Sequence, residues 1–296
     1  MHQDEVVISD GLVRSLLMTQ CPEVAVRPLM RLETWGTDHV IYRLGNDLSI
    51  RLPKIGWAAG QGELESRWLP TLAPHLPVRV PVPVFVGSPA NGYPYRWYVA
   101  PWIEGDNPRV GDDLGRLARE LAAVVRALEA VDATGGPKPT GSQRGGLLEH
   151  ADASTQAGAQ ELRGQVDVDA LLAAWDMGVR APAWDGPPRW VHGDLMDGNL
   201  IVNDGHLTAV IDWGALKAGD PAVELMIAWS FFEPESRATY RTALGVVDDA
   251  MWLRGRAWAT SAALQALPYY RETNPDIVAR SWRAVHAVLA DVGRHR

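Results

Sequence analysis

The chain has 296 residues, of which 47% are hydrophobic and 22% are charged, as in an ordinary folded globular protein; this excludes a disordered tail, a collagen-like fibre and an array of short repeats. Its acidic start and the absence of a long uncharged apolar run predict neither a signal peptide nor a membrane span, so we expect a cytoplasmic protein without membrane contact. The net charge of −8 argues against nucleic-acid binding and is compatible with a cationic small substrate, while the single cysteine excludes an internal disulfide.

The first hundred residues alternate between short β-rich runs and two helical patterns. In chain order they predict a helix over 5–20, strands at Leu29–Thr34, Val40–Leu44 and Leu48–Leu52, a helix over Gly62–Leu72, and strands at Val82–Gly87 and Arg96–Ile103. Gly45-Asn46-Asp47, between the second and third strands, is a favourable hairpin turn. We therefore expect a small β-rich N-terminal lobe over residues 1–103.

The character of the sequence changes after residue 103, and helical spacing dominates from there. The predicted order is a long amphipathic helix over 111–132, a surface loop over 134–146, helices over 147–164 and 167–180, strand and loop over Arg189–Trp213, and helices from Ala222 to the end. Residues 104–296 should form a larger, mainly helical lobe. The predicted fold class is α+β with two lobes.

Polar clusters interrupt the apolar runs between residues 190 and 221. His192-Gly193-Asp194 ends one strand, Asp197-Gly198-Asn199 is a turn before the next, and a further strand ends in Asp212-Trp213-Gly214. Asn203-Asp204-Gly205 is a hairpin turn, so the last two strands should form a ribbon with both polar clusters at one end. Asp194, Asn199 and Asp212 are thereby expected to converge, although isolated turns capped by Asp194 and Asp212 would give the same local patterns.

Two carboxylates and an amide that converge on loops suit a Mg²⁺ site, because Mg²⁺ takes hard oxygen ligands and shares its other positions with substrate phosphates. A carboxylate just off the metal can orient a hydroxyl group and take its proton. In phosphoryl transfer one loop aspartate faces the acceptor, an asparagine from the same loop holds metal, and a later aspartate bridges metal and phosphates. This pattern predicts phosphoryl-transfer chemistry.

Three segments resemble the signature of the aminoglycoside phosphotransferase family: HGDLMDGN at 192–199, VIDWG at 210–214 and, after them, Gly219-Asp220-Pro221. The resemblance extends over most of the chain through the segments YRLGNDLSIRLPK, WLPTLAPHLPVRVP and WYVAPWIEGD. It implies a protein-kinase-like two-lobed fold and phosphorylation of a small molecule by ATP or GTP. By the same resemblance Asp194 is the catalytic base, Asn199 and Asp212 hold Mg²⁺, and His192 supports the loop.

The nucleotide side of such a fold needs a hairpin over the phosphates and a cation on the following strand. Thr37, in a turn without a G-x-G-x-x-G pattern, is expected to donate to a phosphate, with an ordinary turn as the alternative. Arg51 at the centre of SIRLPK is expected to contact phosphate, with Lys54 as the alternative. Its carboxylate partner should come from the helix over 62–72, Glu65 first and Glu63 second.

The lobe connection should present backbone groups to the nucleotide base. Ala100 and Trp102 are the candidates there, since Pro101 has no N–H and the donor must be Trp102 or a neighbour.

The acceptor should lie in front of Asp194, against the helical lobe. Most of the 13 tryptophans should be core residues, with one or two as a wall for a ring. Acidic residues of the later helices could meet ammonium groups, and Glu224, close behind Asp220, is the best placed of them. The others are Asp248, Asp249, Glu272 and Asp276.

These inferences predict a kinase that phosphorylates a hydroxyl group of an aminoglycoside-like antibiotic or a related small molecule. The alternatives within the resemblance are kinases of macrolides, choline-like compounds or sugars. A non-catalytic nucleotide-binding pseudokinase is an alternative of another class, disfavoured by the intact Asp194, Asn199 and Asp212. A protein kinase is disfavoured because only a short segment separates Gly214 from Gly219, which leaves no room for a long activation segment.

Overall fold

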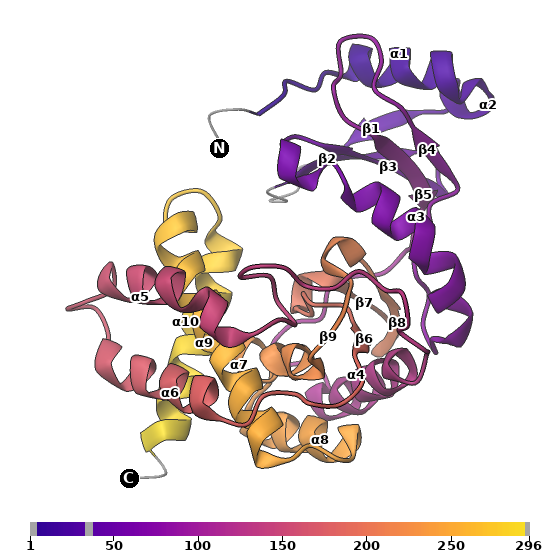
Figure 1. Cartoon of the computed structure of the whole chain (residues 1–296). Coiled ribbons are helices and arrows are strands. Elements are labelled where there is room, and N and C mark those ends of the chain that lie inside the picture. Colours follow the sequence, from indigo (N-terminus) through magenta and orange to yellow (C-terminus); the bar gives the residue numbers. More distant parts are fainter. Residues whose placement is uncertain (1–4, 33–37, 294–296) are drawn as a thin grey trace. The chain divides into compact units, whose positions relative to one another are not determined.

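The computed structural model describes residues 5–32 and 38–293, coloured along the chain in Figure 1. The chain forms two compact units. Unit 1 consists of Met1–Pro74 and Arg79–Glu104, and unit 2 consists of His75–Val78 and Gly105–Arg296. Within the described ranges no helix is both long and apolar enough to cross a membrane.

An antiparallel sheet of five strands organises unit 1. The strands are β1 (Leu29–Arg31), β2 (His39–Leu44), β3 (Leu48–Pro53), β4 (Phe85–Gly87) and β5 (Trp97–Pro101), in the order β1-β2-β3-β5-β4. The β2–β3 hairpin turns at Gly45, whose φ of 62° favours glycine. Strands β4 and β5 are shorter than the predicted Val82–Gly87 and Arg96–Ile103, while the last two residues of the predicted strand Leu29–Thr34 lie outside the described residues.

The helices of unit 1 are α1 (Asp10–Gln20), α2 (Pro22–Ala25) and α3 (Gln61–Leu72), with 3₁₀ turns at Gly56–Ala58 and Ala73–His75. Ser9 caps α1 by accepting the N–H of Leu12 at 3.2 Å, so the helix begins at Asp10 and not at residue 5. Leu16 and Leu17 of α1 pack with Tyr42 and Ile50 of the sheet in a core that includes Trp97. Burial of this helix against strand side chains holds unit 1 together.

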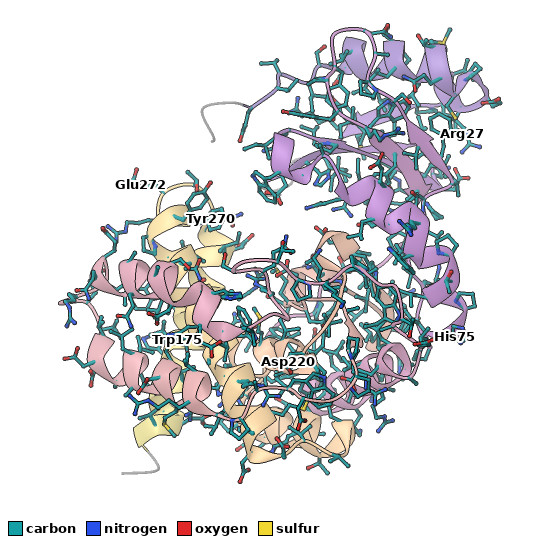
Figure 2. All side chains as sticks on the ribbon, in the orientation of Figure 1. Arg27, His75, Trp175, Asp220, Tyr270 and Glu272 are labelled. Atoms are coloured by element: carbon teal, nitrogen blue, oxygen red, sulfur yellow. The ribbon has the colours of Figure 1, made fainter. Side chains whose placement is uncertain are left out.

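Unit 2 is mainly helical. Its helices are α4 (Leu114–Glu129), α5 (Asp152–Gln160), α6 (Val168–Arg180), α7 (Ile227–Ser230), α8 (Pro234–Leu244), α9 (Asp249–Tyr270) and α10 (Pro275–Gly293), with 3₁₀ turns at Leu148–Ala151, Asp197–Asn199, Trp213–Ala215 and Pro221–Met226. Asp113, Asp167 and Asp248 cap α4, α6 and α9 by accepting backbone N–H groups. Trp175 of α6, labelled in Figure 2, is 1% exposed, and its indole donates to Asp152 of α5.

Two short antiparallel ribbons lie among these helices. Strand β6 (Arg189–Val191) pairs with β9 (Lys217–Gly219), and β7 (Leu200–Asn203) pairs with β8 (His206–Val210). The polar clusters of the sequence follow the ends of these strands. The β-rich unit 1 and the mainly helical unit 2 confirm the predicted α+β fold class.

Candidate active site

The β7–β8 hairpin brings Asn199 next to the segment that leads into Asp212. Leu200 pairs with Val210, and the N–H of Ile211 donates to the Asn199 carbonyl at 2.9 Å. Asp212 follows directly, with φ 63° and ψ 67°. A left-handed aspartate is uncommon, and such backbone strain concentrates at functional sites. The hairpin therefore joins two residues that are 13 positions apart in sequence.

Asp194 is joined to the same group through the backbone. The Asn199 side-chain Nδ2 donates to the Asp194 carbonyl at 2.8 Å, which closes the loop between the two residues. Asn199 is 8% exposed, whereas the Asp194 side chain is 26% exposed and accessible to a small molecule. These backbone contacts thus place Asp194, Asn199 and Asp212 on adjoining loops.

The side chain of His192 holds the start of the loop that carries Asp194. Its Nε2 lies 3.0 Å from the carbonyl of Ile211, and its Nδ1 accepts the N–H of Asp194 at 3.2 Å. Burial lowers the pKa of His192, which favours the neutral ring, donating from Nε2 and accepting at Nδ1. The ring also packs on Trp213, with centroids 4.7 Å apart. His192 therefore links the Asp194 loop to the Asp212 loop, in the supporting position expected from the sequence.

Gly193 gives this loop a conformation that a side chain would disturb. Its φ is 79°, and a Cβ there would lie 2.8 Å from the carbonyl oxygen of Ala215. We expect Gly193→Ala to cost about 1–3 kcal/mol of unfolding free energy and to slow turnover, because relief of the clash must displace Asp194. Thermal unfolding and steady-state kinetics measure the two effects.

Gly164 provides the matched control for that substitution. Its φ of 82° is nearly the same, but no heavy atom lies within 4 Å of the point that a Cβ would occupy there. Gly164→Ala should therefore show the conformational cost alone and leave turnover unchanged. Equal kinetic effects of the two substitutions would contradict a special role for the Gly193 backbone.

Glu224 lies beneath the Asp194 loop, where it holds the backbone. It is 1% exposed, and its Oε1 accepts the N–H of Gly193 at 2.9 Å. This placement differs from the expected one at the acceptor, because the carboxylate is covered by the loop it supports. Burial raises the pKa of Glu224 to about 8, with the neighbouring Glu129 adding to the effect.

The raised pKa of Glu224 predicts a pH-dependent stability. Folding favours the protonated acid, so its contribution is complete below the ordinary pKa of 4.5 and is lost as the pH rises through about 8. Glu224→Gln keeps an acceptor oxygen for Gly193 but does not titrate. We expect the melting temperature of the wild type to fall by several degrees relative to Glu224→Gln across this window, measured by thermal unfolding at stepped pH.

Glu129→Gln is the companion control for the pH experiment. Burial raises the pKa of Glu129 to about 7, but no hydrogen bond joins it to the Asp194 loop within the described residues. It should alter stability in a lower pH window and leave the backbone at Gly193 in place. Melting curves of wild type and Glu224→Gln that stay parallel in pH would contradict the assignment to Glu224.

Arg144 pairs with Asp194, a contact that the sequence did not predict. Its Nη1 donates to the Asp194 Oδ1 from the loop over 134–146. The glycine- and proline-rich composition of residues 134–146 predicts a surface loop and marks no residue there as a contact of Asp194. A single arginine in a loop does not indicate its partner in the sequence, so only the folded chain identifies the pair with Asp194.

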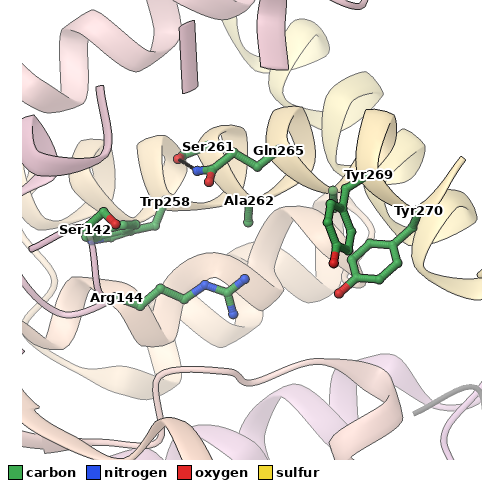
Figure 3. A pocket seen from close by; sticks show the side chains of 9 residues that line it. Ser142, Arg144, Trp258, Ser261, Ala262, Gln265, Tyr269 and Tyr270 are labelled. Carbon is green, nitrogen blue, oxygen red and sulfur yellow. Dashed lines mark hydrogen bonds between the residues drawn. The ribbon is translucent and has the colours of Figure 1, made fainter. Parts of the chain in front are cut away.

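A pocket of about 340 Å³ lies beside this ion pair in unit 2 (Figure 3). Its lining includes Arg144, Trp258, Gln265, Tyr269 and Tyr270. In Figure 3 the Arg144 side chain extends along helix α9, with Trp258 at one end of the pocket and the two tyrosines at the other. The volume is in the lower part of the range for small-molecule sites, roughly 300–1,000 Å³.

In unit 1 the cation and carboxylate expected at a nucleotide site face each other. Arg51 of β3 and Glu65 of α3 are 8% and 0% exposed, and Nη1 of Arg51 lies 4.0 Å from Oε1 of Glu65. The Arg51 guanidinium also lies 5.8 Å from the centroid of the Tyr98 ring. The alternatives are engaged elsewhere: Lys54 lies 3.8 Å from Glu5, and Glu63 pairs with Arg96. Thr37 lies outside the described residues.

The expected base-contacting segment includes the end of β5. The carbonyl of Ala100 accepts the Ser49 hydroxyl at 3.2 Å. The N–H of Trp102 donates to the Asp47 carbonyl at 2.8 Å, so it already has a partner within the sheet. A backbone donor to the base would therefore be a neighbour of Trp102, the alternative that the sequence left open. For the next N–H, that of Ile103, no partner occurs in the described part of the chain.

The family comparison agrees with the geometry. A family model described as "Phosphotransferase enzyme family" matches residues 34–258. This span includes the β-rich unit from its second strand onward, the Asp194 loop and the Asp212 loop.

Individual relatives are distant in sequence. The uncharacterized protein YcbJ of Bacillus subtilis (strain 168) is 24% identical over 191 residues, 62% of this chain and 58% of that protein, so less than two thirds of its length is matched. The GDP complex of wild-type aminoglycoside 2'-phosphotransferase-IIIa has a TM-score of 0.74 at 19% identity and covers 96% of this chain and 99% of that one. The macrolide 2'-phosphotransferase MphH apoenzyme from Brachybacterium faecium has a TM-score of 0.63 at 22% identity and covers 94% and 97%. These likenesses show the two-lobed kinase-like fold.

Proposed function

The chain belongs to the phosphotransferase enzyme family, and on that premise we propose that it is a small-molecule kinase. It transfers the γ-phosphoryl group of ATP or GTP to a hydroxyl group of an aminoglycoside-like antibiotic or a related small molecule. The observation that carries the proposal is the convergence of Asp194, Asn199 and Asp212 through the loop and hairpin hydrogen bonds. The acceptor classes come from the names of the structural relatives, an aminoglycoside and a macrolide phosphotransferase.

Asp194 acts as the base in this proposal. Its carboxylate is partly exposed, and its main chain is fixed by His192 and Asn199, so the side chain can orient an acceptor hydroxyl. The hydroxyl oxygen bonds to the γ-phosphorus as the bond to the β–γ bridging oxygen breaks, and the hydroxyl proton passes to Asp194. The nucleoside diphosphate leaves with the electron pair of the broken bond.

The donor set at Asn199 and Asp212 fits a magnesium ion that arrives with the nucleotide. The Asn199 amide nitrogen donates to the Asp194 carbonyl, so its amide oxygen would be the atom free to hold Mg²⁺ together with the Asp212 carboxylate. Mg²⁺ usually keeps several waters and shares its remaining positions with substrate phosphates, so a small set of protein ligands suffices. When bound, Mg²⁺ would offset the charge of the phosphate oxygens.

The nucleotide-facing roles in unit 1 belong to the same proposal. Arg51 contacts a phosphate while Glu65 keeps its guanidinium in place, as a fork of N–H donors on an oxyanion requires. Ile103 replaces Trp102 as the backbone donor to the base, with Ala100 as the preceding strand residue. A cytoplasmic setting, where nucleoside triphosphates are abundant, is also part of the proposal.

The test is a transfer experiment with the purified protein. It is incubated with Mg²⁺ and ATP or GTP and a panel of aminoglycosides, macrolides and uncharged sugars, and the products are weighed by mass spectrometry. We expect one acceptor class to gain the mass of a single phosphoryl group. Nucleotide binding without transfer to any acceptor would instead favour a pseudokinase, and failure to bind nucleotide would contradict the kinase proposal itself.

A further inference from the structure

The pocket lined by Arg144, the ion-pair partner of Asp194, has the chemistry of an acid-binding and ring-binding site. Its one charged lining residue among those described is Arg144, and no carboxylate of the described residues lines it. The remaining lining is aromatic or uncharged, with Trp258, Tyr269 and Tyr270 as its large side chains. Aromatic side chains of this kind take the apolar face of a sugar or another ring.

The backbone holds Arg144 rigidly in this position. The next residue, Gly145, has a φ of 81°, and its carbonyl accepts the N–H of Asp220 at 2.8 Å. Asp220, inside unit 2 in Figure 2, is itself held by Arg254, with Nε to Oδ2 at 2.7 Å. Earlier in the loop, the Pro137 carbonyl accepts the N–H of Ala218 at 2.8 Å. Arg144 is therefore positioned before any ligand arrives, which reduces the entropy cost of binding one.

The Arg144 guanidinium has hydrogen-bonding capacity left over. It carries five N–H donors, and the pair with Asp194 uses Nη1. For its other donors no partner occurs among residues 5–32 and 38–293. The side chain is 36% exposed, so these donors are open to a molecule in the pocket. A carboxylate or phosphate is the group that a guanidinium fork matches best.

We expect the same pocket to bind a polyamine weakly. The lining offers ammonium groups only uncharged hydroxyl and amide oxygens, and its one charged side chain among the described residues, Arg144, would repel them. Two of the acidic side chains that could have met ammonium groups are engaged otherwise: Glu224 is buried under the loop, and Asp248 caps α9 by accepting the N–H of Met251 at 2.6 Å.

We propose that the acceptor is a ring-bearing hydroxyl compound with an acidic group, not a polycation, and that Arg144 is the residue that selects it. This inference rests on the proposed kinase function and narrows its acceptor to the related small molecules, away from the polycationic aminoglycosides. The acidic group binds the unused donors of Arg144, the ring lies against Trp258 and the tyrosines, and the hydroxyl group meets Asp194. Because Arg144 and Asp194 touch, acid and hydroxyl must be close together on the acceptor.

The test uses three phenyl glycosides that differ only in the substituent on one ring carbon. This substituent is a hydroxymethyl group in phenyl glucoside, a carboxylate in phenyl glucuronide and a protonated aminomethyl group, which carries the ammonium, in the aminodeoxy analogue. Binding to the full-length protein is measured by saturation-transfer NMR titration at low salt. We expect the glucuronide to bind about tenfold more tightly than the ammonium compound, with the glucoside between them.

Arg144→Gln should remove this order and bring the three affinities within about twofold of one another, because the amide keeps hydrogen bonding but has no charge. Arg163→Gln is the matched control: Arg163 is exposed, pairs with Asp169 at 3.1 Å and does not line the pocket. It should leave the order unchanged. Melting temperatures of both variants verify that they fold.

The results separate this inference from the kinase proposal. Any one of four results would overturn the inference. These are undetectable binding of the glucuronide, tightest binding of the ammonium compound, an order of affinities unaffected by Arg144→Gln, and efficient phosphorylation of kanamycin. Binding of Mg²⁺-ATP is measured on the same samples. Nucleotide binding together with any of those results leaves the kinase proposal standing, whereas its loss in the wild type would contradict the kinase proposal directly.

Discussion

Asp194→Ala is expected to reduce kcat by about 10²–10⁴-fold while nucleotide affinity changes by less than about twofold. The carboxylate is the proposed acceptor of the hydroxyl proton, and the backbone that holds it depends on His192 and Asn199, not on its own side chain. The loss should therefore fall on the chemical step. Transfer kinetics and equilibrium binding of Mg²⁺-ATP measure the two quantities on the same preparation.

Two checks keep this prediction specific. Removal of Asp194 leaves Arg144 without its carboxylate, but that pair is partly exposed, so the melting temperature should change little. Asp204→Asn, in the exposed turn between β7 and β8, is the matched control and should be fully active. Activity of Asp194→Ala near that of the wild type would remove Asp194 from the role of base.

Asp212→Asn should weaken the binding of Mg²⁺-nucleotide by about tenfold or more and reduce kcat by at least about 10²-fold. Asparagine tolerates the left-handed backbone at this position, where φ is 63°, so the substitution removes charge without adding strain. The hairpin bond between Ile211 and Asn199 should also persist, since it is made by main-chain atoms. Calorimetric titration with Mg²⁺-ATP measures the affinity.

The dependence on Mg²⁺ concentration identifies the cause of that loss. If Asp212 is a ligand, the variant should need a higher Mg²⁺ concentration for half-maximal turnover, while Asp204→Asn should follow the wild type. An unchanged affinity and an unchanged Mg²⁺ requirement would remove Asp212 from the metal site.

The sequence by itself determined the α+β class and the local structure around the chemistry. Strand runs with a hairpin turn at Gly45 and the amphipathic spacing over 111–132 and 167–180 are local signals, and the structure has a hairpin and helices there. The hairpin predicted at Asn203-Asp204-Gly205 is also present, and its pairing of Leu200 with Val210 puts Asn199 and the segment before Asp212 at the same end of the ribbon.

The tertiary structure decided which side chains surround that centre. Arg144 comes within bonding distance of Asp194 only because backbone bonds at Gly145 and Pro137 anchor its loop to the β9 region. Glu224 points under the loop and not toward an acceptor because Gly193 offers it a backbone N–H at 2.9 Å. Contacts between segments dozens of residues apart depend on tertiary packing, and no periodicity or motif in the sequence indicates such contacts. The candidate residues for phosphoryl transfer could therefore be named from local sequence patterns, whereas the residues that line the pocket could be identified only in the folded chain.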